Sequence, residues 1–326
     1  MTENTQYLTE QLITYIGNKR SLLPFIKQGV EIVQKELNKE FLHCFDVFSG
    51  SGIVSRFLKS YASSITTNDL ETYAKIISSC YLSNKSSINF DELEKIHSEL
   101  VKSTTNEIST CELNGSCPGF VSELYAPKDE DNVQFGERCF YTPYNAKYID
   151  IIRQKITDEV PAELQKFFIA PLLSEVSVHA NTAGIFKGFY KNSRTGKGQF
   201  GGNGKNALER IKGKIELPLP IFSNFECPSY IFQEDANTLI LDEMLYNHLP
   251  EKEFEYPDSN AEEIKYCTYS GQRAGSSCYS TAKGYFTSQY TTVCSGDHSG
   301  KNGVIGGNGG IFEKGLSFQP SAKDAA

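Results

Sequence analysis

The chain has 326 residues and a formal net charge of −8, with 39% hydrophobic and 22% charged residues, which suffices for one large domain or two modest ones. Its apolar runs are short and its first residues are polar, so we expect a cytoplasmic protein without an export signal or a membrane span. Nine cysteines without a C-x-x-C pair argue against a disulfide framework and a zinc site, so no metal is expected.

The segment 21–82 has the pattern of a parallel α/β sheet. Apolar spacing predicts a helix over 21–36 and a buried strand over 43–48, followed by a glycine turn and a helix over 53–60. A second strand over 63–68 and a helix over 73–82 come next. Strands that alternate with helices in this way are typical of a parallel sheet covered by helices.

The rest of the chain reads as a helical stretch, a return to the sheet and an atypical tail. Helices are predicted over 90–101, 145–155 and 163–178, then an exposed loop over 187–206, a third strand over 227–233 and a helix over 238–249. The 66 residues of 261–326 include 11 Gly and 9 Ser but only nine Leu, Ile, Val and Phe together. We therefore expect a disordered or frameshifted tail. The three predicted strands leave an open edge, unless a partner or an unrecognised part of the tail covers it.

Charge is concentrated in one segment. Residues 187–214 contain eight basic residues and one acidic residue, a net charge of +7, so the remainder sums to −15. A local basic patch on an acidic protein can still bind a polyanion.

Two polar patterns follow the first two predicted strands. In Asp46-Val47-Phe48-Ser49-Gly50-Ser51-Gly52, glycines let the backbone approach a ligand closely, and a carboxylate suits an amino group; a structural turn is the alternative. Asn68-Asp69 ends the second strand about 20 residues later, where an acid can bind both hydroxyls of a ribose or simply cap the next helix.

Two further patterns extend the series. Glu234-Asp235-Ala236-Asn237 follows the third strand, where a carboxylate can accept a hydrogen bond from an adenine amino group or cap a helix. Tyr15-Ile16-Gly17-Asn18-Lys19-Arg20 places a glycine turn and a cation just before the first helix. It either wraps the far side of a ligand or is a surface turn.

Together, and in this order, the four patterns resemble those of the Dam-like class of adenine-N6 DNA methyltransferases. The resemblance covers roughly residues 10–250. It implies a Rossmann-like, S-adenosylmethionine-dependent α/β core with an incomplete sheet and an inserted, largely helical recognition domain. By the same resemblance, the S-adenosylmethionine pocket would be lined by Tyr15, Gly17, Asn18, Lys19, Asp46, Phe48, Gly50, Asp69 and Asp235.

The resemblance also implies a DNA-binding insert. Residues 1–84 would begin the core, 85–225 would form the target-recognition insert, 226–258 would return to the core, and 259–326 would be the tail. The partner would be double-stranded DNA, with the basic loop lying along its phosphates. The contacts expected are from Lys187, Lys191, Arg194, Lys197 and Lys205.

The sequence departs from this class at its catalytic motif. An Asp-Pro-Pro-Tyr, whose acid and carbonyl bind the adenine amino group, should lie 15–25 residues after Asp235. Glu253-Phe254-Glu255-Tyr256-Pro257-Asp258-Ser259-Asn260 stands there instead. The nearest match, Tyr141-Thr142-Pro143-Tyr144-Asn145, lacks the acid, which makes Tyr144 a weak catalytic candidate beside its interpretation as a loop and helix cap.

Three functions follow. The first is a monomeric, site-specific adenine methyltransferase of a restriction–modification system, with a cognate endonuclease. In this hypothesis the C-terminal half of the catalytic domain is lost or replaced, through a frameshift or premature divergence near residue 255, and the chain is inactive. The second is a non-catalytic remnant or partner subunit that binds DNA and S-adenosylmethionine. The third, a Rossmann-like enzyme for another nucleotide, lacks a G-x-G-x-x-G run and would set Asp46 against a pyrophosphate.

Overall fold

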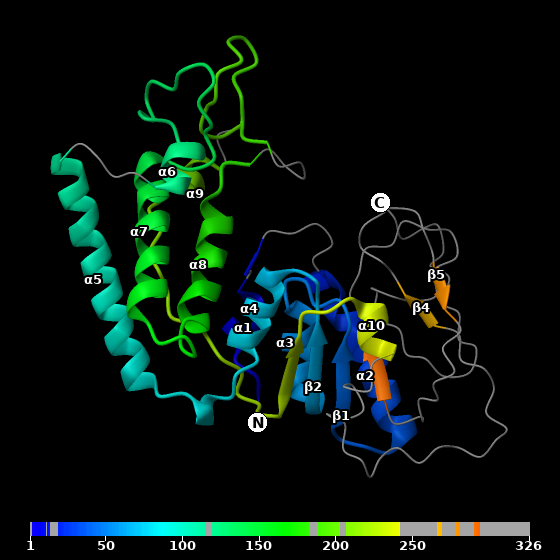
Figure 1. The fold of residues 1–326 in the computed structure, drawn as a ribbon. Helices are drawn as coiled ribbons and strands as arrows, with labels where there is room; N and C mark the ends of the chain where they lie inside the picture. Colours follow the sequence, from blue (N-terminus) through cyan, green and yellow to red (C-terminus); the bar gives the residue numbers. More distant parts are fainter. Residues whose placement is uncertain are drawn as a thin grey trace. The chain divides into compact units, whose positions relative to one another are not determined.

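A computed structural model describes residues 2–10, 12–13, 19–114, 119–182, 188–202 and 207–241, and the short strands 266–268, 278–280 and 290–293 (Figure 1). The chain divides into two compact units. The sheet unit comprises Met1–Thr9, Gly17–Ser87 and Ile221–Ala326, and the helical unit comprises Glu10–Ile16 and Ile88–Pro220.

The sheet unit alternates helices and strands as the sequence predicts. Its helices and turns are α1 (Thr5–Thr9), η1 (Lys19–Leu22), α2 (Leu23–Leu37), α3 (Ile53–Leu58), η2 (Lys59–Tyr61), α4 (Thr72–Tyr81), η3 (Lys85–Ser87) and α10 (Ala236–Leu241). Its strands are β1 (Leu42–Asp46), β2 (Ala62–Asn68), β3 (Ser229–Phe232), β4 (Tyr266–Thr268), β5 (Cys278–Ser280) and β6 (Tyr290–Val293). The predicted strands over 43–48, 63–68 and 227–233 are confirmed, each with boundaries shifted by a few residues.

The main sheet is small and parallel. Its strand order is β3-β2-β1-β6, and β1 pairs in parallel with both β2 and β6. Strand β2 pairs in parallel with β3, with Asn68 opposite Phe232 at the carboxyl end. The ends of β1, β2 and β3 therefore meet at one edge, where the loops that follow them are neighbours.

The sheet has a fourth strand, and the alternative that a part of the tail covers the open edge is the one the structure has. Strand β6 covers the free side of β1, with His43 opposite Tyr290 and Asp46 opposite Val293. Strands β4 and β5 form a separate antiparallel pair. Tyr290–Val293 is a run of aromatic and β-branched residues, which favour strands, within an otherwise Gly- and Ser-rich segment. The tail therefore includes strands in the stretches that the structure describes.

Apolar residues on one face of each element build the core of this unit. Ile26, Val30 and Val33, spaced by four and three residues along α2, are buried. They belong to one cluster with Leu42 and Cys44 of β1, residues of α3 and β2, and Cys227 before β3. Strand β1 alternates buried and half-buried positions, so Asp46 falls on the same face as Leu42 and Cys44. This register draws the carboxylate into the interior.

The helical unit contains α5 (Phe90–Asn114), α6 (Phe120–Leu124), α7 (Pro143–Glu159), α8 (Lys166–His179) and α9 (Leu208–Lys212). The three helices predicted here are confirmed, but α5 and α7 are longer than expected. Figure 1 shows that the loops 125–140 and 188–202 lie at the end of the helical unit where α6 and α9 are found. Across the described ranges, every helix is too short or too polar to cross a bilayer.

Candidate functional site

The glycine turn and the second acidic position meet in the structure. Gly50 and Gly52 follow β1 with φ of 49° and 72°, the left-handed region that favours glycine. Asp69, which follows β2, accepts a hydrogen bond from the Gly50 N–H over 2.8 Å through Oδ2. Its Oδ1 accepts one from the Glu71 N–H over 3.0 Å. Two of the sequence patterns thus form one surface at the carboxyl end of the sheet.

The side chain of Asn68 ties all three loops together. It is 1% exposed, and its Nδ2 donates to the Val47 carbonyl at 3.3 Å and the Glu234 carbonyl at 3.0 Å. Its Oδ1 accepts from the Glu234 N–H at 3.0 Å, and its own carbonyl accepts from the Ser49 N–H at 2.9 Å. Asn68 is therefore the link between the loops that follow β1, β2 and β3. Sequence reasoning gave weight to its neighbour Asp69 and missed this role.

Asp46 lies behind this edge rather than on it. Its side chain is fully buried, and its Oδ2 accepts a hydrogen bond from the Ser55 hydroxyl over 2.5 Å. Ser55 belongs to α3, the helix that the glycine turn opens. The bond anchors the helix start to the strand end, so the arrangement supports the turn. A direct contact of Asp46 with a ligand's amino group stays a prediction.

Asp235 caps a helix. Its Oδ1 accepts hydrogen bonds from the N–H groups of Asn237 at 3.0 Å and Thr238 at 3.2 Å, at the start of α10. The helix-cap interpretation of this acid is therefore confirmed. Both bonds use Oδ1, and the residue is half-buried at the end of β3. A cap of this kind is compatible with Oδ2 facing a ligand.

The remaining cofactor candidates are placed in part. Lys19 is buried in η1, and Phe48 is half-buried after β1. Tyr15, Gly17 and Asn18 lie outside the described residues, as does the segment 253–260.

The polar groups at this edge fit S-adenosylmethionine. That molecule presents a ribose diol, an adenine amino group and a cationic amino acid, for which carboxylates are suitable acceptors. Each carboxylate oxygen of Asp69 already accepts one backbone N–H, but an ionised carboxylate has about four acceptor sites, so each oxygen can accept another bond. Asp69 is half-buried and thus reachable from solvent.

Tyr144 lies in the helical unit, in the first turn of α7. Thr142 caps this helix by accepting the Asn145 N–H at 3.2 Å, and Pro143 occupies the first turn. The Tyr144 ring stacks on Tyr148 at 6.5 Å between centroids, and the Lys214 ammonium lies 4.5 Å from its centre. The loop-and-cap interpretation of this sequence is confirmed. A catalytic role for Tyr144 stays an untested prediction.

The basic loop forms a turn with an internal scaffold. Residues 192–197, here called the basic turn, are closed by the Asn192 N–H donating to the Lys197 carbonyl at 2.9 Å. The Asn192 Oδ1 accepts the N–H groups of Arg194 at 3.0 Å and Thr195 at 3.1 Å, and Gly196 has φ of 69°. Arg194 is exposed and Lys197 half-exposed on this turn.

Two further cations of the basic segment have partners inside the unit. Lys191 is exposed, with its ammonium 5.2 Å from the Phe189 ring. Lys212 forms an ion pair with Glu130 at 3.3 Å and approaches Asp131 at 3.8 Å. The acids Glu130 and Asp131 therefore offset part of the positive charge of the basic segment. Lys187 and Lys205 lie outside the described residues.

A second buried asparagine joins the two loops of this unit. Asn181 is fully buried, and its Nδ2 donates to the carbonyls of Cys139 at 2.6 Å and Gln199 at 2.9 Å. Its Oδ1 accepts the Gly201 N–H at 3.0 Å. Through Asn181, the segment that follows the basic turn is thereby bonded to the loop that precedes α7. Nothing in the local sequence signals such a role.

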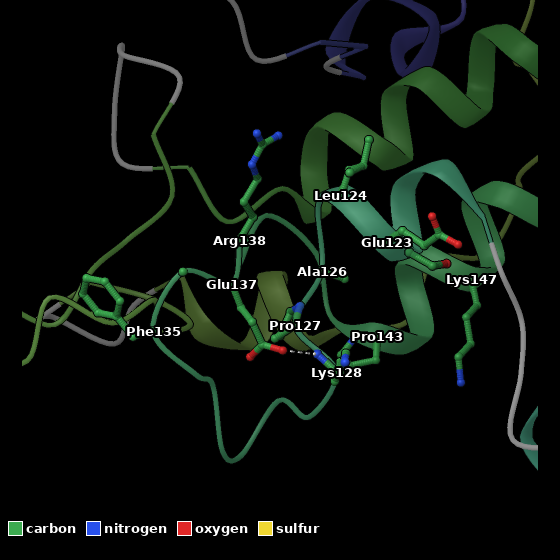
Figure 2. A pocket seen from close by; sticks show the side chains of 12 residues that line it. Glu123, Leu124, Ala126, Pro127, Lys128, Phe135, Glu137, Arg138, Pro143 and Lys147 are labelled. Carbon is green, nitrogen blue, oxygen red and sulfur yellow. Dashed lines mark hydrogen bonds between the residues drawn. The ribbon is translucent and has the colours of Figure 1, made fainter.

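An open cavity of about 730 Å³ lies in the helical unit. Figure 2 shows the side chains around it, which come from α6, the loop 126–138 and the start of α7. Lys128, Arg138 and Lys147 supply positive charge, Glu123 and Glu137 negative charge, and Phe135 an exposed ring. Of the predicted cofactor-binding residues that the structure describes, none lines this cavity.

Comparison with known proteins identifies relatives of the chain. The profile of a family described as D12 class N6 adenine-specific DNA methyltransferase matches residues 15–210. The type II methyltransferase M.FokI of Planomicrobium okeanokoites is 29% identical over 233 residues, covering 69% of this chain and 32% of its own length. The type II methyltransferase M.CviAII of Paramecium bursaria Chlorella virus 1 is 29% identical over 233 residues, covering 70% of this chain and 60% of its own length.

A third relative, the modification methylase StsI of Streptococcus sanguinis, is 25% identical over 232 residues, covering 69% of this chain and 31% of its own length. The matched part therefore spans about a third of M.FokI and StsI. No solved structure matches the chain.

Proposed function

The chain belongs to the D12 class N6 adenine-specific DNA methyltransferase family, and on this premise we propose that it is by descent a site-specific adenine methyltransferase of a restriction–modification system, which binds S-adenosylmethionine and double-stranded DNA. The observation that carries the proposal is the meeting of Asp69 with the Gly50 N–H at the carboxyl end of the sheet. Parallel α/β sheets bind their ligands at this edge. When bound there, S-adenosylmethionine supplies the methyl group.

The residues of the chain divide the binding work. Asp69 accepts the hydroxyls of the ribose, and the glycine turn gives the backbone close access to the ligand. Asp235 faces the adenine amino group, and Tyr15, Gly17, Asn18, Lys19, Asp46 and Phe48 complete the pocket as the family resemblance implies. Asn68 positions the loop before Asp235 through its bonds to Glu234, and the Gly50 and Glu71 N–H groups orient Asp69.

The helical unit is the target-recognition region of this proposal. The cations of the basic turn, with Lys187, Lys191 and Lys205, lie along DNA phosphates, where each one releases counterions. Recognition of a specific base sequence falls to the same unit, because the sheet edge is occupied by the cofactor. In this proposal the chain acts as a monomer in the cytoplasm, beside a cognate endonuclease. The names of its relatives, a type II methyltransferase and a modification methylase, support the restriction–modification part of the proposal.

We propose that this chain alone transfers little or no methyl group. The sequence has no Asp-Pro-Pro-Tyr, whose acid and carbonyl would hold the adenine amino group. The competing proposal is a non-catalytic partner that retains both binding surfaces. The assay measures methyl transfer from labelled S-adenosylmethionine to mixed-sequence duplex DNA by the purified chain. Both proposals expect little or no transfer, and turnover would overturn the claim of inactivity.

Cofactor binding is tested by calorimetry with S-adenosylmethionine on the purified chain. Asp69→Ala removes the two acceptor oxygens and should lower affinity at least about ten-fold, the loss of roughly 1.4 kcal/mol, in line with hydrogen bonds to a charged acceptor. Glu36→Gln, an exposed carboxylate at the end of α2, is the matched control and should leave affinity unchanged. Equal binding by all three proteins would refute the assignment of Asp69.

A further inference from the structure

The loop 126–139 between α6 and α7 is built to hold its tip in place. The Glu137 carboxylate accepts hydrogen bonds from the backbone N–H groups of Lys128 at 3.1 Å and Gln134 at 2.7 Å. The Gln134 side chain in turn donates to the Asn132 carbonyl at 2.7 Å, and Gly136 adopts φ of 93°. The residue at this tip, Phe135, is therefore presented by an internally bonded loop (Figure 2).

Phe135 is exposed, whereas other aromatic residues of the helical unit are packed. Its side chain is 80% exposed, while Tyr125, Phe140 and Phe189 pack on one another at centroid distances of 5.5 and 5.1 Å. Burying a phenylalanine side chain stabilises a protein by about 1.5–3 kcal/mol, so leaving one in water at an ordered tip forgoes a substantial gain. A lone exposed apolar side chain is ordinary on a protein surface, so the groups around Phe135 decide what it can bind.

The ring lies beside the basic turn. A methyl group built on Gly196 of that turn would come within 3.9 Å of the Phe135 Cε2. The Asn181 bonds described above fix the same two loops to each other at Cys139, Gln199 and Gly201. The aromatic tip and the exposed Arg194 are thus parts of one fixed surface.

Two of the acids near this surface are engaged, while Asp129 and Asp131 of the same loop are exposed. The Glu137 carboxylate accepts two backbone N–H groups, and Glu130 pairs with Lys212 at 3.3 Å. Arg138, whose guanidinium lies 5.5 Å from the Tyr125 ring, and Lys128 add positive charge on the cavity side of Phe135. The positive charge nearest the ring comes from the basic turn, with the exposed Arg194 and the half-exposed Lys197. An apolar ring beside such cations matches the two chemical components of a nucleic acid, a flat base and a phosphate.

We propose that Phe135 is a base-stacking side chain, which stacks on an unstacked base of the DNA while Arg194 and Lys197 of the adjacent turn bind the flanking phosphates. This inference rests on the proposed DNA-binding function and deepens it. An aromatic wedge beside phosphate contacts stabilises DNA in which a base step is opened, which is the state needed to extract a base from the helix.

The first test compares two DNA probes. One is a fully paired mixed-sequence duplex, and the other is the same duplex with a single abasic site, where the gap in the stack admits an aromatic ring. Stacking on a base contributes about 1–3 kcal/mol, so the wild-type chain should prefer the abasic duplex by about five-fold to about 150-fold. Phe135→Ala should abolish this preference, and Phe90→Ala, at the 41% exposed start of α5, should retain it.

The second test uses fluorescence, because the chain contains no tryptophan. Phe135→Trp places a single reporter at the loop tip, and stacking on a base should quench its emission on addition of the abasic duplex. Phe90→Trp is the control and should keep its emission. Both variants replace an exposed ring by a larger exposed ring, so neither is expected to disturb folding.

The outcomes separate the two levels of the proposal. Binding of duplex DNA that is weakened by Arg194→Ala and by salt, without a preference that depends on Phe135, would overturn the stacking role and leave DNA binding intact. Absence of binding to either duplex at low salt by every variant would overturn the DNA-binding function and the stacking role together. A preference lost in Phe135→Ala, with quenching in Phe135→Trp, supports both.

Discussion

Replacement of Asn68 by alanine is the sharpest test of the sheet edge. The change removes three side-chain hydrogen bonds, to the Val47 carbonyl and to the Glu234 carbonyl and N–H. Each contributes about 1 kcal/mol net, so the free energy of unfolding should fall by about 2–3 kcal/mol. Urea denaturation of the wild-type and variant chains measures this difference.

Asn68→Asp adds a second prediction from the same geometry. The aspartate would keep an acceptor for the Glu234 N–H but turn an oxygen, in place of Nδ2, toward two carbonyl oxygens. The loss should therefore equal or exceed that of Asn68→Ala. Both variants should also bind S-adenosylmethionine more weakly, because the loops after β1 and β3 are no longer held to β2. Asn106→Ala on the exposed side of α5 is the control. A change below about 0.5 kcal/mol in Asn68→Ala, the range of ordinary surface substitutions, would refute the reasoning.

Three other outcomes are expected. Burial raises the pKa of the Cys44 thiol to about 12, so iodoacetamide at pH 8 should modify half-buried Cys111 well before Cys44; equal rates by peptide mapping would contradict this. Burial lowers the pKa of Lys59 from 10.5 to about 8, so the unfolded chain holds more protons between these values. The stability of wild type relative to Lys59→Met should rise with pH across that window, and a flat difference would count against it. Asn181→Ala should lower the thermal midpoint of the helical unit, since it breaks three bonds between two loops.

The sequence was most informative where a local pattern coincides with a local structure. Strands β1 and β2 and helix α2 have an apolar face that can be read within a dozen residues. The sequence predicts that this helix ends at Val101, whereas α5 continues to Asn114. The next two buried positions are the polar Thr104 and then Ile108. A polar residue at an inward position hid the period of 3.6 residues from sequence reasoning.

Contacts between distant parts of the chain could not be foreseen. Asn68 bonds to Glu234, 166 residues away, and β6 pairs with β1 across almost the whole chain. Neither relation leaves a mark in the residues on either side. The pairing of Asp69 with Gly50 was within reach, because both follow adjacent strands of a sheet that the pattern itself predicts.

One consequence concerns how such a protein can change in evolution. The chain leaves the sheet unit near Ser87 and returns near Ile221. Just inside these points, Asn84 exchanges hydrogen bonds with the Cys227 backbone at 3.1 and 3.3 Å, and Glu226 accepts from the N–H and hydroxyl of Ser86 at 2.8 and 2.7 Å.

Exit and return are thus fastened side by side within the sheet unit, independent of what lies between them. Insertions tolerate replacement best where their ends lie close together. The 88–220 segment is therefore placed to be exchanged as a cassette. Under the proposed function, a single recombination of this kind would bring in a new recognition surface while the sheet keeps its sequence.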